Sequence, residues 1–155
     1  MKLLLFSDSH GHVEYRDEME KEVRRGSLPD AVLFAGDAGF SSNHIFPEVP
    51  YYSVRGNCDF SSSAPDWELI VFGEHRIYLA HGHLHRAKLT RGLLASDASK
   101  QQARIAVYGH THNQGLEIVN SVYCVNPGAL KNGQYAFLNL FSDGRIQPEF
   151  RRIRL

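Results

Sequence analysis

Metal-ligand residue types follow five separate apolar runs of this chain. The five segments are Asp8-Ser9-His10, Gly36-Asp37, Gly56-Asn57, His81-Gly82-His83 and Gly109-His110-Thr111-His112. Oxygen and imidazole donors together suit first-row divalent cations such as Mn, Fe, Co, Ni or Zn. Each segment alone reads more simply as turn or capping chemistry. All five in order, each after an apolar run, indicate a two-metal hydrolytic site.

The histidines are clustered. Of nine, seven lie in three short segments, namely His10 and His12, then His81, His83 and His85, then His110 and His112. Histidines that only covered a surface would be scattered, so this clustering favours metal ligands or a proton relay. Two cations about 3.5–4 Å apart can bind one phosphate together with the attacking oxygen, and a metal-bound water loses its proton near neutral pH.

Strands must bring these segments together. Short apolar runs predict buried strands over residues 2–6, 31–35, 51–54 and 105–108, and residues 67–72 and 76–80 predict a hairpin around Gly73-Glu74. Sites in open α/β sheets form beyond the carboxyl ends of the strands. We therefore expect the ligand-type residues to converge at one rim.

The remaining elements complete an α/β pattern. Helices are predicted over residues 13–25 and 88–102, the second with Leu89, Leu93 and Leu94 on one side. Strand-like runs joined by short turns follow at residues 116–119, 122–125, 135–140 and 146–153. This order predicts a parallel or mixed sheet packed on a more antiparallel one.

Composition adds few constraints on function. The 155 residues predict a single domain over 1–155, and 17 basic against 17 acidic side chains give no sign of a nucleic-acid or membrane partner. No apolar stretch approaches the ~20 residues of a membrane span. Cys58 and Cys124 lack CxxC spacing, so a cytoplasmic location is expected. A homodimer is only the commonest default.

The five segments, with Cys58-Asp59 after Asn57 and the later Asn126-Pro127-Gly128, resemble the signature blocks of the calcineurin-like metallophosphoesterases. The small size and Cys58 resemble its small single-domain phosphodiesterase branch, the YfcE-like proteins. The resemblance runs from Lys2 to about Gly128. It implies a four-layer α/β/β/α sandwich of two mixed sheets that hydrolyses phosphodiesters through a hydroxide bridging two divalent cations. Mn²⁺ is the first choice of ion by resemblance, with Ni²⁺, Fe²⁺, Co²⁺ or Zn²⁺ also compatible.

The same resemblance implies a role for each residue. Asp8, His10 and His112 would hold the first ion, Asn57, His81 and His110 would hold the second, and Asp37 would bridge them. Asp37 and Asn57 would also take part in catalysis, joined by Asp59 and His83. His83 is expected to line the pocket, and His85 either lines it too or starts a solvated helix.

Cys58 departs from the wider superfamily, whose protein-phosphatase members have a His directly after the Asn. A thiol with a pKa near 8.5 is a poor substitute for imidazolium. We therefore expect slow turnover of alkyl esters and faster turnover of activated esters, unless His12 or His83 supplies the acid. As a nucleophile Cys58 is disfavoured.

Two other functions stay open at this point. A non-catalytic binding scaffold on the same fold, as in the retromer scaffold subunit, need not keep every candidate ligand, and this chain has them all. A phosphomonoesterase is disfavoured by Cys58. The natural substrate is not specified by the sequence, beyond a small phosphodiester.

Overall fold

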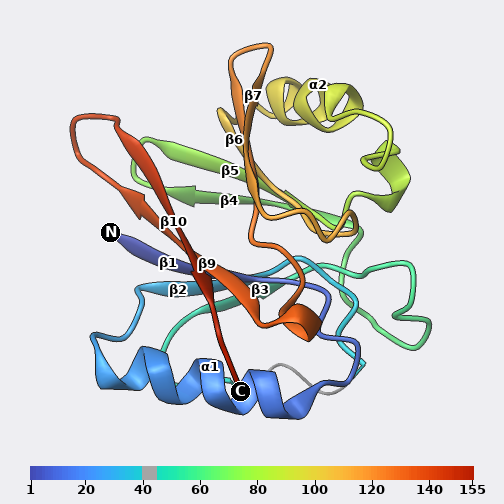
Figure 1. Ribbon diagram of the computed structural model, residues 1–155. Helices are drawn as coiled ribbons and strands as arrows, with labels where there is room; N and C mark the ends of the chain where they lie inside the picture. The colour runs from blue at the N-terminus through green and yellow to red at the C-terminus, as the bar shows by residue number, and fades with distance from the viewer. Residues whose placement is uncertain (40–44) are drawn as a thin grey trace.

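Two five-stranded sheets and two α-helices make up the computed structural model, which describes residues 1–39 and 45–155 (Figure 1). The first sheet has the order β10-β9-β1-β2-β3. Its strands are β1 (Lys2–Phe6), β2 (Ala31–Phe34), β3 (Tyr51–Ser53), β9 (Gln134–Leu140) and β10 (Ile146–Arg152). The second sheet has the order β4-β5-β6-β8-β7. Its strands are β4 (Trp67–Phe72), β5 (His75–Ala80), β6 (Ile105–Val107), β7 (Gly115–Val119) and β8 (Val122–Asn126).

Both sheets are mixed. In the first, β1, β2 and β3 are parallel, and β9 and β10 add antiparallel pairs. In the second, β5, β6 and β8 are parallel, and β4 and β7 lie antiparallel at the edges. Each sheet therefore contains three parallel strands whose carboxyl ends lie at the same edge, which is where a site can form.

Four layers follow from how the apolar side chains alternate. Along β1, Leu3 and Leu5 face the second sheet, whereas Leu4 and Phe6 belong to the core beneath helix α1 (Val13–Arg25). A third core, rich in alanine, lies between the second sheet and helix α2 (Gly92–Lys100). The predicted α/β/β/α sandwich of two mixed sheets is confirmed (Figure 1).

The expectation that a parallel or mixed sheet packs on a more antiparallel one was wrong, because both sheets are mixed. The C-terminal strands do not form a sheet of their own, because β7 and β8 extend the second sheet whereas β9 and β10 return to pair with β1. A strand such as β9, buried on both faces, satisfies its backbone equally well in either sheet. The sequence pattern therefore does not identify its neighbour.

The helix predicted over residues 88–102 is shorter than expected, at Gly92–Lys100. A short 3-10 helix, η1 (His83–His85), precedes it, and Arg86 has a φ of 51°, which an α-helix cannot contain. Leu89 lies before this helix, and Leu89 and Leu93 are 75% and 52% exposed whereas Leu94 is buried, so the three leucines do not form one apolar side. Leu94, Ala95 and Ala98 face the sheet instead, and their small side chains let the helix lie close to it.

Within the described residues, no helix is both long and apolar enough to cross a membrane.

Candidate metal centre

The five ligand-bearing segments all leave the ends of parallel strands. Asp8 follows β1, Asp37 follows β2, Asn57 follows β3, His81 follows β5 and His110 follows β6. The loops are joined by backbone hydrogen bonds, from Asp8 N–H to the Gly36 carbonyl (2.9 Å) and from His10 N–H to the Asp37 carbonyl (3.1 Å). Three strand ends of the first sheet and two of the second thus meet at one rim.

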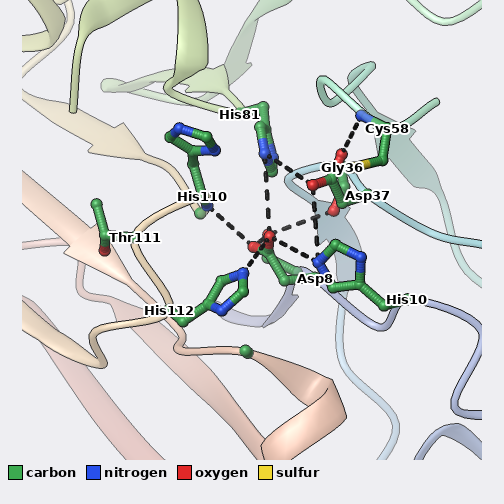
Figure 2. A network of polar contacts seen from close by, with 12 residues as sticks. Asp8, His10, Gly36, Asp37, Cys58, His81, His110, Thr111 and His112 are labelled. Atoms are coloured by element: carbon green, nitrogen blue, oxygen red, sulfur yellow. Dashed lines mark hydrogen bonds and ion pairs between the residues drawn. The ribbon is translucent and has the colours of Figure 1, made fainter. Parts of the chain in front are cut away.

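Asp8 lies at the centre of this rim and is completely buried (Figure 2). Its Oδ1 is 3.0 Å from Nε2 of His112, 3.5 Å from Nε2 of His10 and 3.9 Å from Nε2 of His81. Its Oδ2 accepts hydrogen bonds from the Ser7 hydroxyl (2.5 Å) and from the backbone N–H of His110 (3.0 Å). One carboxylate oxygen is therefore anchored, and the other faces three imidazoles.

The two carboxylate oxygens of Asp37 also have different partners. Its Oδ1 accepts the Cys58 N–H at 2.8 Å, and its Oδ2 lies 3.3 Å from Nε2 of His81 and 3.7 Å from Nε2 of His10. Burial alone would raise the pKa of Asp37, but the hydrogen bond and charge of His81 hold that pKa well below its usual range. Asp37 is thus an anion placed between two histidines.

The Asp59 carboxylate accepts three backbone hydrogen bonds. Its Oδ2 accepts the N–H groups of Asp37 (2.7 Å) and Gly56 (2.8 Å), and its Oδ1 accepts that of Ala38 (3.0 Å). Asp59 therefore ties the loop that follows β2 to the loop that follows β3. This arrangement gives it a positioning role.

His81 is completely buried and has a defined tautomer. Its Nδ1 lies 2.6 Å from the Ala35 carbonyl oxygen, which can only accept, so Nδ1 donates. Nε2 faces two further acceptors, the Oδ1 of Asn57 at 3.0 Å and the Oδ2 of Asp37 at 3.3 Å. Burial would lower the pKa of His81, but its hydrogen bond to Asp37 and the charges of Asp8 and Asp37 raise it.

The remaining histidines lie around this centre. His110 packs its ring edge-on against His81, with centroids 5.0 Å apart, and His83 lies 5.4 Å from His81 by the same measure. Burial and the charge of His81 lower the pKa of His110 to about 4, and the same causes lower the pKa of His83. Burial also lowers the pKa of His112. The lowered pKa values of His110 and His112 favour the neutral imidazole that metal ligation requires.

The donor set fits divalent cations. Among the described residues, ligand atoms within 4.8 Å of one another form the groups Asp8–His10–His112, Asp8–Asp37–His81 and His10–Asp37–Cys58. The Nε2 of His10 is buried and makes no hydrogen bond within the described residues 1–39 and 45–155. A neutral His81 would point its Nε2 lone pair at two oxygens, and a cation between these acceptors removes the repulsion. His110 belongs to none of the three groups.

The backbone at the centre is held in a sparsely populated conformation. Five candidate ligands have left-handed φ angles between 45° and 66°, namely Asp8, His10, Asp37, His110 and His112. Such residues cost on the order of 1–3 kcal/mol each and persist where the surroundings over-determine them. Here the short helix η2 (Leu130–Asn132) holds the backbone: the N–H of Leu130 donates to the backbone carbonyl of Ser7, and the N–H of Lys131 donates to that of Asp8.

Glycines allow the loops to approach the carboxylates. A Cβ on Gly109 would lie 2.5 Å from Oδ2 of Asp8 and closer still to the Ser7 hydroxyl, and a Cβ on Gly56 would collide with Asp37. Neither position tolerates a larger residue unless the carboxylate moves.

Sequence reasoning did not single out Ser7, and it assigned no role to Asn126. Ser7 hydrogen-bonds Asp8, and buried Asn126 donates its Nδ2 to the Gly109 carbonyl (3.1 Å) and to Thr111 Oγ1 (3.0 Å). Asn126 stands at the end of β8, and an amide following an apolar run was the available signal. His85 neither lines the centre nor starts a solvated helix, because it is buried between the Tyr78 hydroxyl and Asp97.

Residues 1–139 match the family model of the calcineurin-like phosphoesterase superfamily domain. The chain belongs to this superfamily. Among relatives of the superfamily, it is 33% identical over 149 residues to the probable metallophosphoesterase YsnB of Bacillus subtilis, covering 92% of this chain and 86% of that protein. It is 25% identical over 154 residues to phosphodiesterase YfcE of Escherichia coli, covering 84% of this chain and 79% of that protein.

Solved structures of other proteins have the same fold as this chain. A predicted phosphoesterase from Streptococcus pneumoniae superposes with a TM-score of 0.82 at 25% identity, covering 97% of this chain and 88% of that one. Vps29 from Entamoeba histolytica superposes with a TM-score of 0.73 at 20% identity, covering 99% and 100%. The second likeness concerns the fold alone.

Proposed function

We propose that this protein is a phosphodiesterase whose active site holds two divalent cations. The observation that supports this most strongly is the buried group Asp8, Asp37 and His81. Its ligand atoms, from two carboxylates and an imidazole, lie within 4.8 Å of one another. Two buried carboxylates this close repel each other, and cations between them remove that cost.

The assignment of ligands combines this geometry with the family pattern. The first ion would be held by Asp8, His10 and His112, and the second by Asn57, His81 and His110. Asp37 would bridge the two, because its Oδ2 faces both His10 and His81. When bound, the ions would lower the pKa of a coordinated water and neutralise charge on the phosphoryl oxygens. Mn²⁺ is the expected occupant by resemblance, and the donor set also suits Ni²⁺, Fe²⁺, Co²⁺ and Zn²⁺.

The chain's own groups prepare this site. The Ala35 carbonyl keeps Nδ1 of His81 protonated and so leaves Nε2 for a cation, and Asp59 fixes the backbone of Asp37. Asn57 presents its Oδ1 on the same side as Nε2 of His81. Each of these contacts lowers the reorganisation needed when substrate binds.

Among the residues that the structure describes, the site lacks a strong acid that could protonate the leaving group. Desolvation and the charge of Asp37 raise the pKa of the Cys58 thiol, and burial lowers the pKa of His83. A protonated thiol with a raised pKa and a neutral imidazole are both poor acids near pH 7. The site therefore favours phosphodiesters whose leaving group departs without a proton.

Hydrolysis of a chromogenic phosphodiester with added Mn²⁺ tests the proposal. The parent protein should cleave the diester faster than a matched monoester, and Asp37→Asn should reduce metal-dependent turnover by at least ~10²-fold, since even outer contacts to metal ligands contribute ~10–100-fold. Asp143→Asn, in the exposed turn between β9 and β10, is the matched control and should retain activity. Absence of metal-dependent hydrolysis in the parent would favour a binding scaffold on this fold instead.

A further inference from the structure

A cavity of about 500 Å³ is lined by residues of helix α1 and of strands β1, β9 and β10. Helix α1 begins three residues after the candidate ligand His10 and ends at Arg25, which lines the cavity. The helix has 13 residues and therefore spans about 20 Å. The C-terminal end of β10 runs down beside α1 (Figure 1). The cavity is thus separate from the candidate metal centre.

Basic side chains predominate around this cavity. Its charged lining residues are four basic ones and one acidic one, namely Lys2, Arg25, Arg151 and Arg152 against Glu22. The whole chain, in contrast, has 17 basic and 17 acidic side chains and a formal net charge of zero. The Glu22 carboxylate accepts a hydrogen bond from the Tyr135 hydroxyl at 2.8 Å. Positive charge is therefore concentrated at this cavity, and an anion is the ligand that it fits.

Two of the four cations are available to a ligand. Within residues 1–39 and 45–155, neither the Lys2 ammonium nor the Arg152 guanidinium forms an ion pair or a side-chain hydrogen bond. Lys2 is half-buried, and its Nζ lies 4.0 Å from the centroid of the Phe137 ring. The guanidinium of Arg151 lies over the same ring at 5.7 Å. A half-buried ammonium without a counter-ion is costly, and a bound anion would offset that cost.

The other two cations have carboxylate neighbours that a ligand can replace. Arg25 lies 4.0 Å from Glu18, and Arg151 pairs with Glu149. Ion pairs between exposed side chains are worth at most about 1 kcal/mol. A multiply charged anion that contacts several cations at once would compete well with them.

We propose that this cavity is a second ligand site, which binds a small molecule through an oligophosphate group of two or more adjacent phosphates. Arginine can bind phosphate oxygens through two parallel hydrogen bonds, and lysine binds them as a point charge. Four cations around one cavity exceed what a single phosphate can satisfy. The cavity volume is in the range of small-molecule sites, and the basic residues surround one hollow instead of forming the long stripe typical of nucleic-acid binding.

Titration calorimetry of the chelator-treated protein tests this proposal, because removal of metal keeps phosphates from binding to ions at the metal centre. Inorganic tripolyphosphate and adenosine triphosphate are the two probes. Tripolyphosphate should bind one to one and at least ~10-fold more tightly than orthophosphate, since it reaches several cations. Equal affinities of the two probes would indicate recognition of the phosphates alone, and tighter binding of adenosine triphosphate would add a contact to the nucleoside. Failure of tripolyphosphate to bind, or binding no tighter than that of orthophosphate, would overturn the proposal.

Substitutions locate the site. Lys2→Gln and Arg151→Gln should each weaken tripolyphosphate binding by ~10-fold or more. Arg145→Gln is the matched control, because Arg145 lies 4.5 Å from the Phe141 ring and pairs with Asp143, as Arg151 does with Phe137 and Glu149. It removes the same charge from the turn before β10 and should bind normally. Equal weakening in all three variants would reveal unspecific attraction and overturn the proposal, as would unchanged binding in Lys2→Gln and Arg151→Gln.

This inference does not depend on the proposed phosphodiesterase activity. Lys2 and Arg151 lie away from the metal centre, so both variants should hydrolyse the chromogenic diester with Mn²⁺ at the parent rate. A parent protein that binds tripolyphosphate without hydrolysing the diester would retain this site and lose the proposed function, and the reverse result would do the opposite. Unchanged melting temperatures verify that the variants are folded.

Discussion

The Nδ1 of His81 lies 2.6 Å from the carbonyl oxygen of Ala35, the residue that directly follows β2. This contact crosses from the second sheet to the first and determines which nitrogen of His81 is free. Since Nδ1 must donate, Nε2 is the nitrogen that faces Asp37 at the candidate centre. The packing of the two sheets thus sets the chemistry of the site.

Metal binding should stabilise the fold, because the candidate ligands come together only in the folded chain. At a free ion concentration of about 100 times Kd, one site contributes about 2.7 kcal/mol, which corresponds to a rise in Tm of about 5–11 °C for a domain of this size. Thermal unfolding with Mn²⁺ and with chelator measures this difference. Identical melting temperatures in the two conditions would count against any specific site.

The metal-free protein should be most stable near pH 6.5. Below that pH, the lowered pKa values of His110, His83 and His112 mean that the unfolded chain binds more protons, so stability falls as the pH falls toward about 4. Above it, the raised pKa of His81 means that the folded chain holds the extra proton, so stability falls as the pH rises through that pKa.

Asp37 extends the acid limb of this profile. Its lowered pKa contributes stability above the unfolded value of about 3.8, and that stability is lost as the pH falls through the folded pKa. Urea unfolding across the pH range in the presence of chelator measures the whole curve. His110→Gln should flatten the limb between about pH 6.5 and 4, and an unaltered limb in that variant would contradict the assignment.

Gly109→Ala should disrupt the centre through sterics alone. The new Cβ would press on the Ser7 hydroxyl and Asp8 Oδ2, so we expect a loss of about 1–3 kcal/mol in unfolding free energy and weaker metal binding. Gly115→Ala, at the start of β7, is the matched control because its Cβ would meet nothing within 4 Å. Equal effects of the two substitutions on metal affinity would refute this explanation.

Turnover should depend steeply on the leaving group. Because neither Cys58 nor His83 is a strong acid near pH 7, aryl diesters with acidic leaving groups should react ~10²–10⁴-fold faster than alkyl diesters. A series of phosphodiesters of graded leaving-group pKa measures this slope. Equal rates along the series would show that another group supplies the proton.

Much of this architecture could be predicted from the sequence, because β1, β2 and β6 are continuous apolar runs that end in polar ligand types. Parallel strands of one sheet end at one edge, so Asp8 and Asp37, which follow β1 and β2, had to approach one another. Helix α1 was also predictable, since its apolar spacing brings Met19 and Val23 to the core.

The rest depends on contacts between segments that are distant in sequence. Nothing local shows that β9 returns to β1, that Asp59 binds three backbone N–H groups, or that Asn126 supports the loop carrying His110 and His112. Nor does a leucine pattern reveal that alanines, not Leu89 and Leu93, face the sheet under α2. These features follow from packing and from polar groups that must find partners once buried.

The stoichiometry of metal binding tests the central claim most directly. Titration calorimetry of the chelator-treated protein with Mn²⁺ should show two ions bound per chain, and Asp37→Asn should lose the high-affinity binding. Failure of the parent protein to take up Mn²⁺ or any other first-row divalent ion, or uptake that is unchanged in Asp37→Asn, would contradict a two-metal centre built around Asp37.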